Sequence, residues 1–389
     1  MDTIFSNTKD AFSIKTDFEL LRAHFLFKII QNKFLVKIGA LIINIALKFH
    51  LPIIPIVKLT VFDHFCGGVS EKDCNSIIKK MYNKNVCSVL DFSTEGFKNE
   101  IEFDKCLNKK LSIIDFIKDR KDIPFAVFKP TCLGREVLFK KISSNQKLEL
   151  KEVEEWKRIK NRFNDVCSKA FQNNVKILID AEEVSVQKAI DDLALKMMIR
   201  FNKKKAIVYN TIQMYRWDRI DYINNILSKN SDIILGFKLV RGAYMEKERE
   251  ISNTLKIKSP ICNDKASTDL NFNLAIDLVF KNLDRISFVC GSHNEFSILK
   301  ILNMMSEKNI KKNDDKIWFG QLYGMSDNIS FNLGIKGYNI FKILPYGPVR
   351  NLIPYLIRRA EENTSVRGQT GRELQLILDE RKRRRLEKN

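Results

Sequence analysis

Apolar residues are spaced differently in the first 85 residues and in the rest of the chain. Residues 18–49 carry apolar side chains at intervals of three and four, the spacing of one helix face, and Pro52 and Pro55 end the pattern. A second helix is expected over residues 70–82, since Ser-Glu-Lys-Asp is a start of the capping-box type. We therefore predict a helical arm over residues 1–84.

From residue 86, short apolar runs rich in β-branched and aromatic residues alternate with amphipathic stretches. Unbroken apolar runs are typical of strands buried on both faces, as in parallel sheets. The runs cover residues 87–93, 124–131, 176–183, 206–213, 234–244, 286–293, 316–324 and 339–347. Eight strand–helix units predict an α/β fold, a (β/α)8 TIM-like barrel over residues 85–366. An additional helix is expected over 149–171, and a C-terminal basic helix over 367–389.

Polar or charged residues recur where these apolar runs end. They are Lys129, Asp180, Gln213, Lys238, Arg241, His293, Gln321 and Tyr346. In a barrel of this type the carboxyl ends of the strands meet at one mouth, where active sites are built. The sequence therefore predicts a site at this mouth that is rich in cations and suited to anionic ligands.

A pair of arginines follows the last apolar run. A turn over residues 345–348 leads into a helix on which Arg358, Arg359 and Glu362 share one face. Two neighbouring guanidinium groups can bind a carboxylate or phosphate through paired hydrogen bonds. From this segment alone, an exposed helix with Arg–Glu pairs is the alternative.

The net charge of +20 raises the question of a nucleic-acid or anionic-membrane partner. The lysines are scattered along the chain, and Arg381–Arg385 is the one dense basic run, which ends a predicted helix. We interpret the charge as compositional and expect no nucleic-acid partner. A membrane contact by the apolar arm or the basic tail stays a secondary hypothesis.

Cysteine and histidine usage argues against a metal site. The eight cysteines form no CxxC pair, and three of the four histidines lie in the arm. Free thiols and the lack of a recognisable leader sequence lead us to expect a cytoplasmic protein, with peripheral attachment to the inner face of the membrane as an option. P-loop, GxSxG and GxGxxG motifs are also absent from the sequence.

The chain resembles the proline dehydrogenase family over essentially its whole length. The matching segments, in the family's order, are LDFSTEG, FKPTCLG, LIDAEE, YNTIQMY, KLVRGAY, DKASTD, GSHNE, FGQLYGM, LPYGPV and YLIRRAEEN. The resemblance implies FAD-dependent oxidation of L-proline to Δ1-pyrroline-5-carboxylate, with a hydride passing from C5 to the flavin N5. It also implies that electrons go on to a quinone and that a separate pyrroline-5-carboxylate dehydrogenase takes the product.

The resemblance also assigns roles to individual residues. It implies catalytic roles for Asp180 and Lys238. It implies substrate contacts by Lys129, Leu322, Tyr346, Arg358 and Arg359. It implies non-covalent FAD contacts by Ala181, Gln213, Arg241, Gly242, Ala243, Ser292, His293 and Glu362.

Two features bear on chemistry and specificity. Bacterial bifunctional members read RLVKGAY where this chain reads KLVRGAY, so the sequence leaves open whether Lys238 or Arg241 approaches the flavin N5. Hydroxyproline dehydrogenases carry a smaller residue where Tyr346 is matched, so a tyrosine there favours proline.

Three alternatives remain beside this interpretation. A hydroxyproline dehydrogenase would share the fold and the cofactor. A basic membrane- or nucleic-acid-binding scaffold would group its cations on a helix face. A barrel for a phosphorylated ligand would need a Gly-rich loop near the last strands, and GPVRN supplies one glycine.

Overall fold

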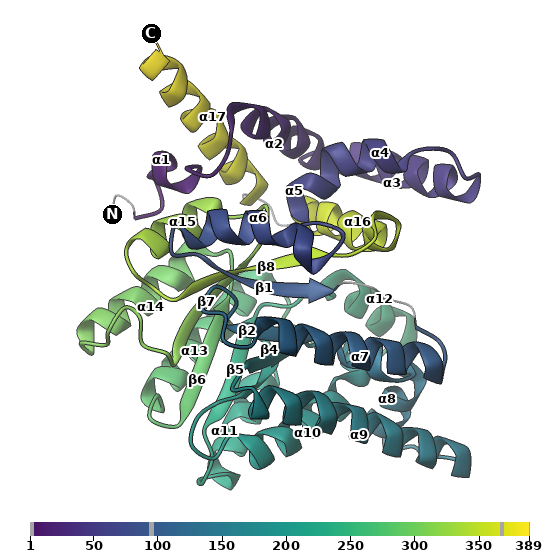
Figure 1. The fold of residues 1–389 in the computed structure, drawn as a ribbon. Coiled ribbons are helices and arrows are strands. Elements are labelled where there is room, and N and C mark those ends of the chain that lie inside the picture. Colours follow the sequence, from purple (N-terminus) through teal and green to yellow (C-terminus); the bar gives the residue numbers. More distant parts are fainter. Residues whose placement is uncertain (1–3, 93–96, 366–368, 389) are drawn as a thin grey trace. The chain divides into compact units, whose positions relative to one another are not determined.

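The computed structural model describes residues 4–92, 97–365 and 369–388, and it describes no side chains for residues 362–365, 369 and 370. The chain forms two compact units, whose elements are labelled in Figure 1. Unit 1 comprises residues 1–94 and 321–389, and unit 2 comprises residues 95–320. The boundaries of the three predicted domains differ from these units and stay a prediction.

The strands follow one another in chain order around a closed barrel. They are β1 (Cys87–Phe92), β2 (Phe125–Phe128), β3 (Lys176–Ile179), β4 (Val208–Gln213), β5 (Leu235–Val240), β6 (Ile286–Gly291), β7 (Ile317–Leu322) and β8 (Ile340–Tyr346). Each strand lies inside one of the predicted apolar runs, and the predicted (β/α)8 fold is confirmed. Most of the predicted runs are longer than their strands, because the apolar and polar residues of the adjoining loops continue the pattern.

The register of the parallel pairs in unit 2 decides which side chains point away from the helices. Leu178 of β3 is opposite Tyr209 of β4, and the next residue of β4, Asn210, hydrogen-bonds Asp191 of a surrounding helix. Because strand side chains alternate, Tyr209 belongs to the opposite, inner face. Its hydroxyl lies 2.8 Å from the Ser287 hydroxyl, on another strand of the same unit.

Helices alternate with the strands of unit 2. They are α7 (Glu100–Ile117), the 3₁₀ turn η2 (Pro130–Leu133), α8 (Glu136–Ser143), α9 (Leu150–Gln172), α10 (Val184–Phe201), α11 (Arg219–Lys229), α12 (Met245–Leu255), α13 (Lys265–Lys281) and α14 (Glu295–Glu307). The additional helix expected over residues 149–171 is α9, and Glu149 is its N-cap.

Unit 1 combines the arm, β1, β8 and the C-terminal helices. Its helices are α1 (Thr8–Ala11), α2 (Asp17–Ile30), α3 (Lys33–Lys48), α4 (Ile54–Val57), the π-helical turn η1 (Lys58–Phe62), α5 (Asp63–Phe65), α6 (Glu71–Tyr82), α15 (Asp327–Ile335), α16 (Val349–Ser365) and α17 (Gln369–Lys388). The pattern over residues 18–49 forms two helices, because the Asn32 side chain accepts from the N–H groups of Phe34 and Leu35 and starts α3 anew. The capping box predicted at Ser70 is confirmed.

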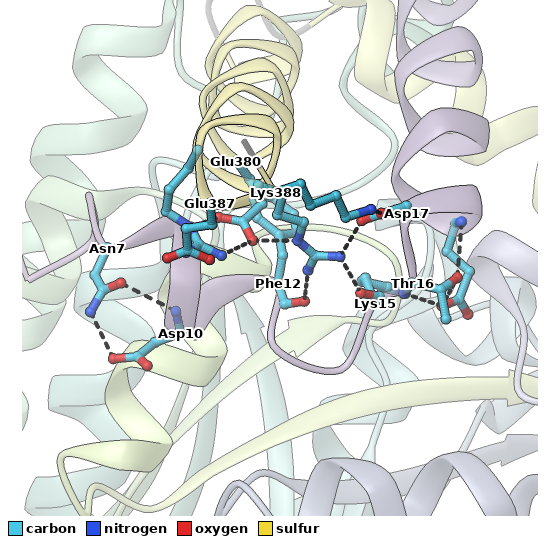
Figure 2. A network of polar contacts seen from close by, with 12 residues as sticks. Asn7, Asp10, Phe12, Lys15, Thr16, Asp17, Glu380, Glu387 and Lys388 are labelled. Carbon is cyan, nitrogen blue, oxygen red and sulfur yellow. Dashed lines mark hydrogen bonds and ion pairs between the residues drawn. The ribbon is translucent and has the colours of Figure 1, made fainter.

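The C-terminal helix α17 is attached to the N-terminal segment, and in Figure 1 it runs beside α2. Arg384 donates hydrogen bonds to the backbone oxygens of Phe12 (3.0 Å) and Lys15 (2.9 Å) and pairs with Asp17 at 2.9 Å. Figure 2 shows this network around Glu380, a buried carboxylate that accepts from Arg384 at 2.7 Å. Part of the basic run therefore holds the two ends of the chain together.

A buried ion pair fixes α15 to β8. Lys342 and Asp327 approach to 2.7 Å with side chains 0% and 8% exposed, and Lys342 also donates to the backbone oxygen of Met325. Burial alone would raise the pKa of Asp327, but the charges of Lys342 and Lys15 hold it below its ordinary value. A charge removed from water in this way is stable only while its partner stays in place.

Replacing Lys342 with methionine is expected to lower the free energy of unfolding by roughly 3–5 kcal/mol, because Asp327 would keep a buried charge without its main partner. Denaturant titration measures the loss. The double variant Lys342→Met/Asp327→Asn should lose less than the single variant. Lys203→Met, which removes an exposed pair with Asp232, should stay within about 0.5 kcal/mol of wild type. A Lys342→Met variant as stable as this control would contradict the prediction.

Candidate active site

Four predicted site residues lie on the inner face of unit 2, where strands β2 to β5 end. Lys129 and Asp180 each follow their strand by one residue, and Gln213 and Lys238 lie on β4 and β5. The alternation that places Tyr209 inward also places Gln213 inward, together with Lys238, which is paired with Thr211. The structure therefore gathers these side chains as the sequence predicted.

The closest contact in this group joins two charges. Lys238 Nζ lies 2.6 Å from Asp180 Oδ1, with the lysine side chain 7% and the aspartate side chain 21% exposed. The backbone N–H of Asp180 donates to the carbonyl of Phe128 at 3.0 Å, which continues the β2–β3 pairing and fixes the carboxylate. A buried ammonium group requires such a partner, because desolvation without compensation is costly.

A second carboxylate, Glu182, was not predicted from the sequence. It accepts hydrogen bonds from the backbone N–H (2.9 Å) and the hydroxyl (2.7 Å) of Thr131. Burial raises the pKa of Glu182 to about 7, although the bonds from Thr131 and the charge of Lys129 act in the opposite direction. Glu182 thus holds the turn after β2, which begins at Lys129, to the segment after β3. The available signal was its place in LIDAEE, two residues after Asp180.

Gln213 is held by one end of its amide. Its Nε2 donates to the backbone oxygen of Glu182 at 3.1 Å. Its Oε1 is buried and has no hydrogen-bond partner among the described residues. A buried acceptor left in this state costs free energy unless a ligand donates to it, so this amide is poised to receive an N–H group.

Arg241, directly after β5, is oriented by three side chains and one ring. Its Nε donates to Asp269 (2.7 Å), and its two Nη atoms donate to Ser292 (2.7 Å) and Ser297 (3.0 Å). The guanidinium carbon lies 4.5 Å from the centre of the Phe272 ring. Asp269 and Ser297 were not predicted as site residues, although Asp269 ends the quoted segment DKASTD.

The next residues form a tight turn. Gly242 has φ +131°, and a Cβ atom there would lie 2.5 Å from the Tyr215 ring, so only glycine fits. Ala243 is exposed, whereas Ala181 and His293 are partly buried. All of these residues belong to the loops that follow strands of unit 2.

The arginine pair belongs to unit 1. Arg358 and Arg359 lie on α16 and are both partly buried, and the Arg359 guanidinium lies 5.4 Å from the centre of the Tyr355 ring. Leu352 and Leu356 of the same helix are buried in a core cluster shared with the arm. The side chain of Glu362 lies outside the described residues.

Two strand-end residues of unit 1 point toward helices. Gln321 accepts from the Ser330 hydroxyl of α15 at 3.1 Å, so its expected place at the mouth is wrong; it lies at an outward position of the alternating strand. Tyr346 is fully buried and donates to Glu71 at 2.9 Å, while burial raises the pKa of its phenol. The opposite face of β8 carries Ile343, which is partly exposed.

Comparison with known proteins gives these residues a context. The family model described as proline dehydrogenase matches residues 74–372. The chain belongs to the proline dehydrogenase family.

Several family relatives are similar over most of their length. Mitochondrial proline dehydrogenase 2 of Arabidopsis thaliana is 31% identical over 377 residues, covering 85% of this chain and 79% of the relative. The carbapenem antibiotics biosynthesis protein CarD of Pectobacterium carotovorum subsp. carotovorum is 32% identical over 322 residues, covering 82% of this chain and 83% of the relative. The protein is therefore an oxidoreductase of the proline dehydrogenase family.

Solved structures agree on the fold. Proline utilization A from Bdellovibrio bacteriovorus, in a form inactivated by N-propargylglycine, superimposes with a TM-score of 0.69 at 21% identity. The match covers 81% of this chain and 34% of that protein, so the chain spans about a third of its length.

Among the residues that the structure describes, no group of His, Cys, Asp and Glu has the arrangement of a metal site.

The raised pKa of Glu182 predicts a pH-dependent contribution to the stability of this family member. In the unfolded chain the carboxyl group loses its proton near its ordinary pKa of 4.5, and in the folded chain only near 7. The stabilisation by the bound proton is therefore present at low pH and lost as the pH rises from about 4.5 to 7.

Glu182→Gln removes this titration. The free energy of unfolding of the wild type should accordingly fall relative to that of the variant across the same pH window, as measured by denaturant titration at several pH values. Glu154→Gln, on the exposed surface of α9, is the matched control. A wild-type-minus-variant difference that does not change with pH would refute the assignment.

Proposed function

We propose that the protein oxidises L-proline to Δ1-pyrroline-5-carboxylate, with non-covalent FAD as its cofactor. The observation that carries the proposal is that the family match over residues 74–372 spans a barrel with charged side chains at the ends of its strands. The chemistry that FAD would supply when bound is redox chemistry, as the acceptor of a hydride from C5 of the substrate.

The residues of unit 2 fit this cofactor in donor and acceptor type. Gln213 offers a buried oxygen that can accept from an N–H group, and Arg241 is a fixed cation that suits a pyrophosphate. Gly242 keeps the turn free of a side chain. The residues of unit 2 proposed to hold FAD are Ala181, Gln213, Arg241, Gly242, Ala243, Ser292 and His293. The FAD contact of Glu362, in unit 1, stays a prediction.

Lys238, rather than Arg241, is the cation that we assign to the reacting end of the cofactor. Arg241 is turned toward Asp269, Ser292 and Ser297, each of which accepts from one of its nitrogens, so its guanidinium is oriented away from Asp180. Lys238 donates to Asp180 alone among the described residues, which leaves two of its three N–H bonds for a ligand. The 2.6 Å contact with Asp180 orients the ammonium group, and a cation placed there would stabilise negative charge that develops during the reaction.

The substrate carboxylate is assigned to Lys129, Arg358 and Arg359. Guanidinium groups bind carboxylates through two parallel hydrogen bonds and need no change of protonation. The roles of Leu322 and Tyr346 at the substrate ring stay a prediction. Tyr346 has a second task, because its hydroxyl binds Glu71.

The remaining assignments concern partners and location. We propose a quinone as electron acceptor, a separate pyrroline-5-carboxylate dehydrogenase as the next enzyme, and a cytoplasmic location with peripheral attachment to the inner face of the membrane as an option. No single described helix is long and apolar enough to cross a bilayer; α2 and α3 meet the criterion only together and are bent by 102°.

A hydroxyproline dehydrogenase is the second candidate. The hydroxyproline dehydrogenase of Xenopus laevis is 37% identical over 229 residues, which cover 57% of this chain. No feature of the described residues favours this substrate over proline.

Arg359→Met is expected to raise the KM for L-proline severely. Losing one arm of the carboxylate clamp should cost roughly 2–5 kcal/mol, about 30-fold or more in kcat/KM. Steady-state kinetics with a water-soluble electron acceptor measure the change, and product trapping identifies pyrroline-5-carboxylate. Arg350→Met, at an exposed position of the same helix, should keep the wild-type KM. A near-normal KM in Arg359→Met would refute the clamp.

Variants on the two faces of β8 test which of its side chains contacts the substrate ring. Ile343→Ser should raise kcat/KM for 4-hydroxyproline relative to L-proline if the face turned away from the helices contacts the ring. Tyr346→Phe keeps the ring and removes the bond to Glu71, so it should lower stability and leave substrate preference unchanged. A change of preference in Tyr346→Ser, with none in Ile343→Ser, would assign the contact with the substrate ring to Tyr346.

A further inference from the structure

The arm of unit 1 exposes an unusual amount of apolar surface. Of the 30 large apolar side chains that are exposed among the described residues, 13 fall within residues 18–59. We call the part on and after α3 the arm surface; it consists of Phe34, Leu35, Ile38, Leu41, Ile42, Ile45, Phe49, Leu51, Ile56 and Leu59. Apolar residues concentrated in this way mark a site of interaction.

The arm surface is the outer side of a helix that is well packed on its inner side. Val36 and Ala46 of α3 are buried, and Ile43 and Leu47 pack against the core cluster that contains Leu352 of α16. The helix is therefore held in place without the exposed side chains. Their exposure is a property of the folded unit.

The charged side chains within the arm segment are of one sign. Residues 20–62 contain six lysines and arginines and no aspartate or glutamate. Five of the six are exposed: Lys28, Lys33, Lys37, Lys48 and Lys58. None of these lysines forms an ion pair among the described residues.

We propose that the arm surface binds an anionic lipid bilayer, with α3 lying in the interface and its apolar side chains entering the acyl region. Apolar side chains flanked by lysines are typical of helices that lie in the plane of a membrane, and anionic headgroups attract the lysines. A second copy of the chain fits less well. A twofold contact through this surface would set lysines against lysines with no acidic residue in the segment to compensate.

The geometry of the arm suits contact with one leaflet. The α2 and α3 helices meet at 102°, and α2 packs along α17 while α3 packs on α16. Because α16 carries Arg358 and Arg359, binding through α3 brings the helix of the arginine pair next to the bilayer. If the proposed function holds, this places the arginine pair of the carboxylate clamp beside the phase in which a lipid-soluble quinone dissolves.

Co-sedimentation of the full chain with lipid vesicles tests the proposal. Wild-type protein should bind phosphatidylcholine vesicles that contain phosphatidylglycerol, bind pure phosphatidylcholine vesicles weakly, and release in high salt. The double variant Ile42→Glu/Phe49→Glu places charges at side chains that are 54% and 68% exposed, so folding should be unaffected. Its binding to the anionic vesicles should fall roughly tenfold or more.

The matched control is Leu150→Glu/Phe296→Glu, which alters side chains 89% and 83% exposed outside the arm and should bind as wild type does. Equal binding by wild type and the arm variant overturns the proposal. So does a wild-type dimer in sedimentation velocity that the arm variant dissociates while vesicles stay unbound.

Activity separates this proposal from the proposed function. With a water-soluble acceptor, the arm variant should oxidise proline as wild type does. Vesicle binding without any proline oxidation would support membrane binding by the arm surface and refute the proposed function. Proline oxidation without vesicle binding would support the proposed function and refute membrane binding by the arm surface.

Discussion

The ion pair between Lys238 and Asp180 is the contact on which the site of unit 2 depends. Burying a lysine side chain to 7% exposure is costly unless a fixed negative group lies beside its ammonium group. The fold supplies that group at the end of β3, two strands away from β5 in the barrel, where the backbone N–H of Asp180 continues the pairing with β2. The same strand ends carry Lys129 and Gln213, and Glu182 ties their loops together. Positive charge is thus built into the barrel by side chains that the strand ends hold in place.

Unit 1 uses the same principle for a different purpose. Lys342 and Asp327 are buried opposite charges that join β8 to α15, and Glu380 gathers Arg383 and Arg384 where α17 meets the N-terminal segment. These contacts fix β8 and α17, the elements that precede and follow α16 in the chain. Apolar side chains of the arm pack against α16 itself. The arginine pair therefore projects from a helix whose position is set by packing, as a clamp for a carboxylate requires.

The sequence predicted the barrel well because its signals are redundant. Eight apolar runs, seven of which have a named polar residue near their end, place β1 to β8 and the cluster around Lys238 without knowledge of any contact. It predicted less well wherever a single residue decides the outcome. Gln321 and Tyr346 both end apolar runs, yet the two-residue alternation of the strand turns them toward Ser330 and Glu71. A shift of one position reverses the face on which a strand residue lies. The ends of short strands cannot be predicted from sequence to within one residue, so the face of a strand-end residue cannot be predicted either.

Contacts between distant segments could not be predicted from the sequence for a different reason. Glu182 and Thr131 are 51 residues apart, and Arg241 and Asp269 are 28 apart. Each residue alone resembles an ordinary loop or helix residue, and its importance follows only from the partner that the fold supplies. The apolar spacing of residues 18–49 likewise predicted helix but not the break at Asn32, where one amide side chain caps a new helix.

Whether the residues at the strand ends hold a flavin that L-proline reduces is tested most directly by the visible spectrum of the purified protein. A bound oxidised flavin absorbs near ~450 nm, and this band is lost on reduction. We predict that the band is present, or appears after addition of FAD, and that anaerobic L-proline abolishes it while 4-hydroxyproline does so far less. A protein that takes up no FAD, or a flavin band that L-proline leaves unchanged, would contradict the assignment of these residues to proline oxidation.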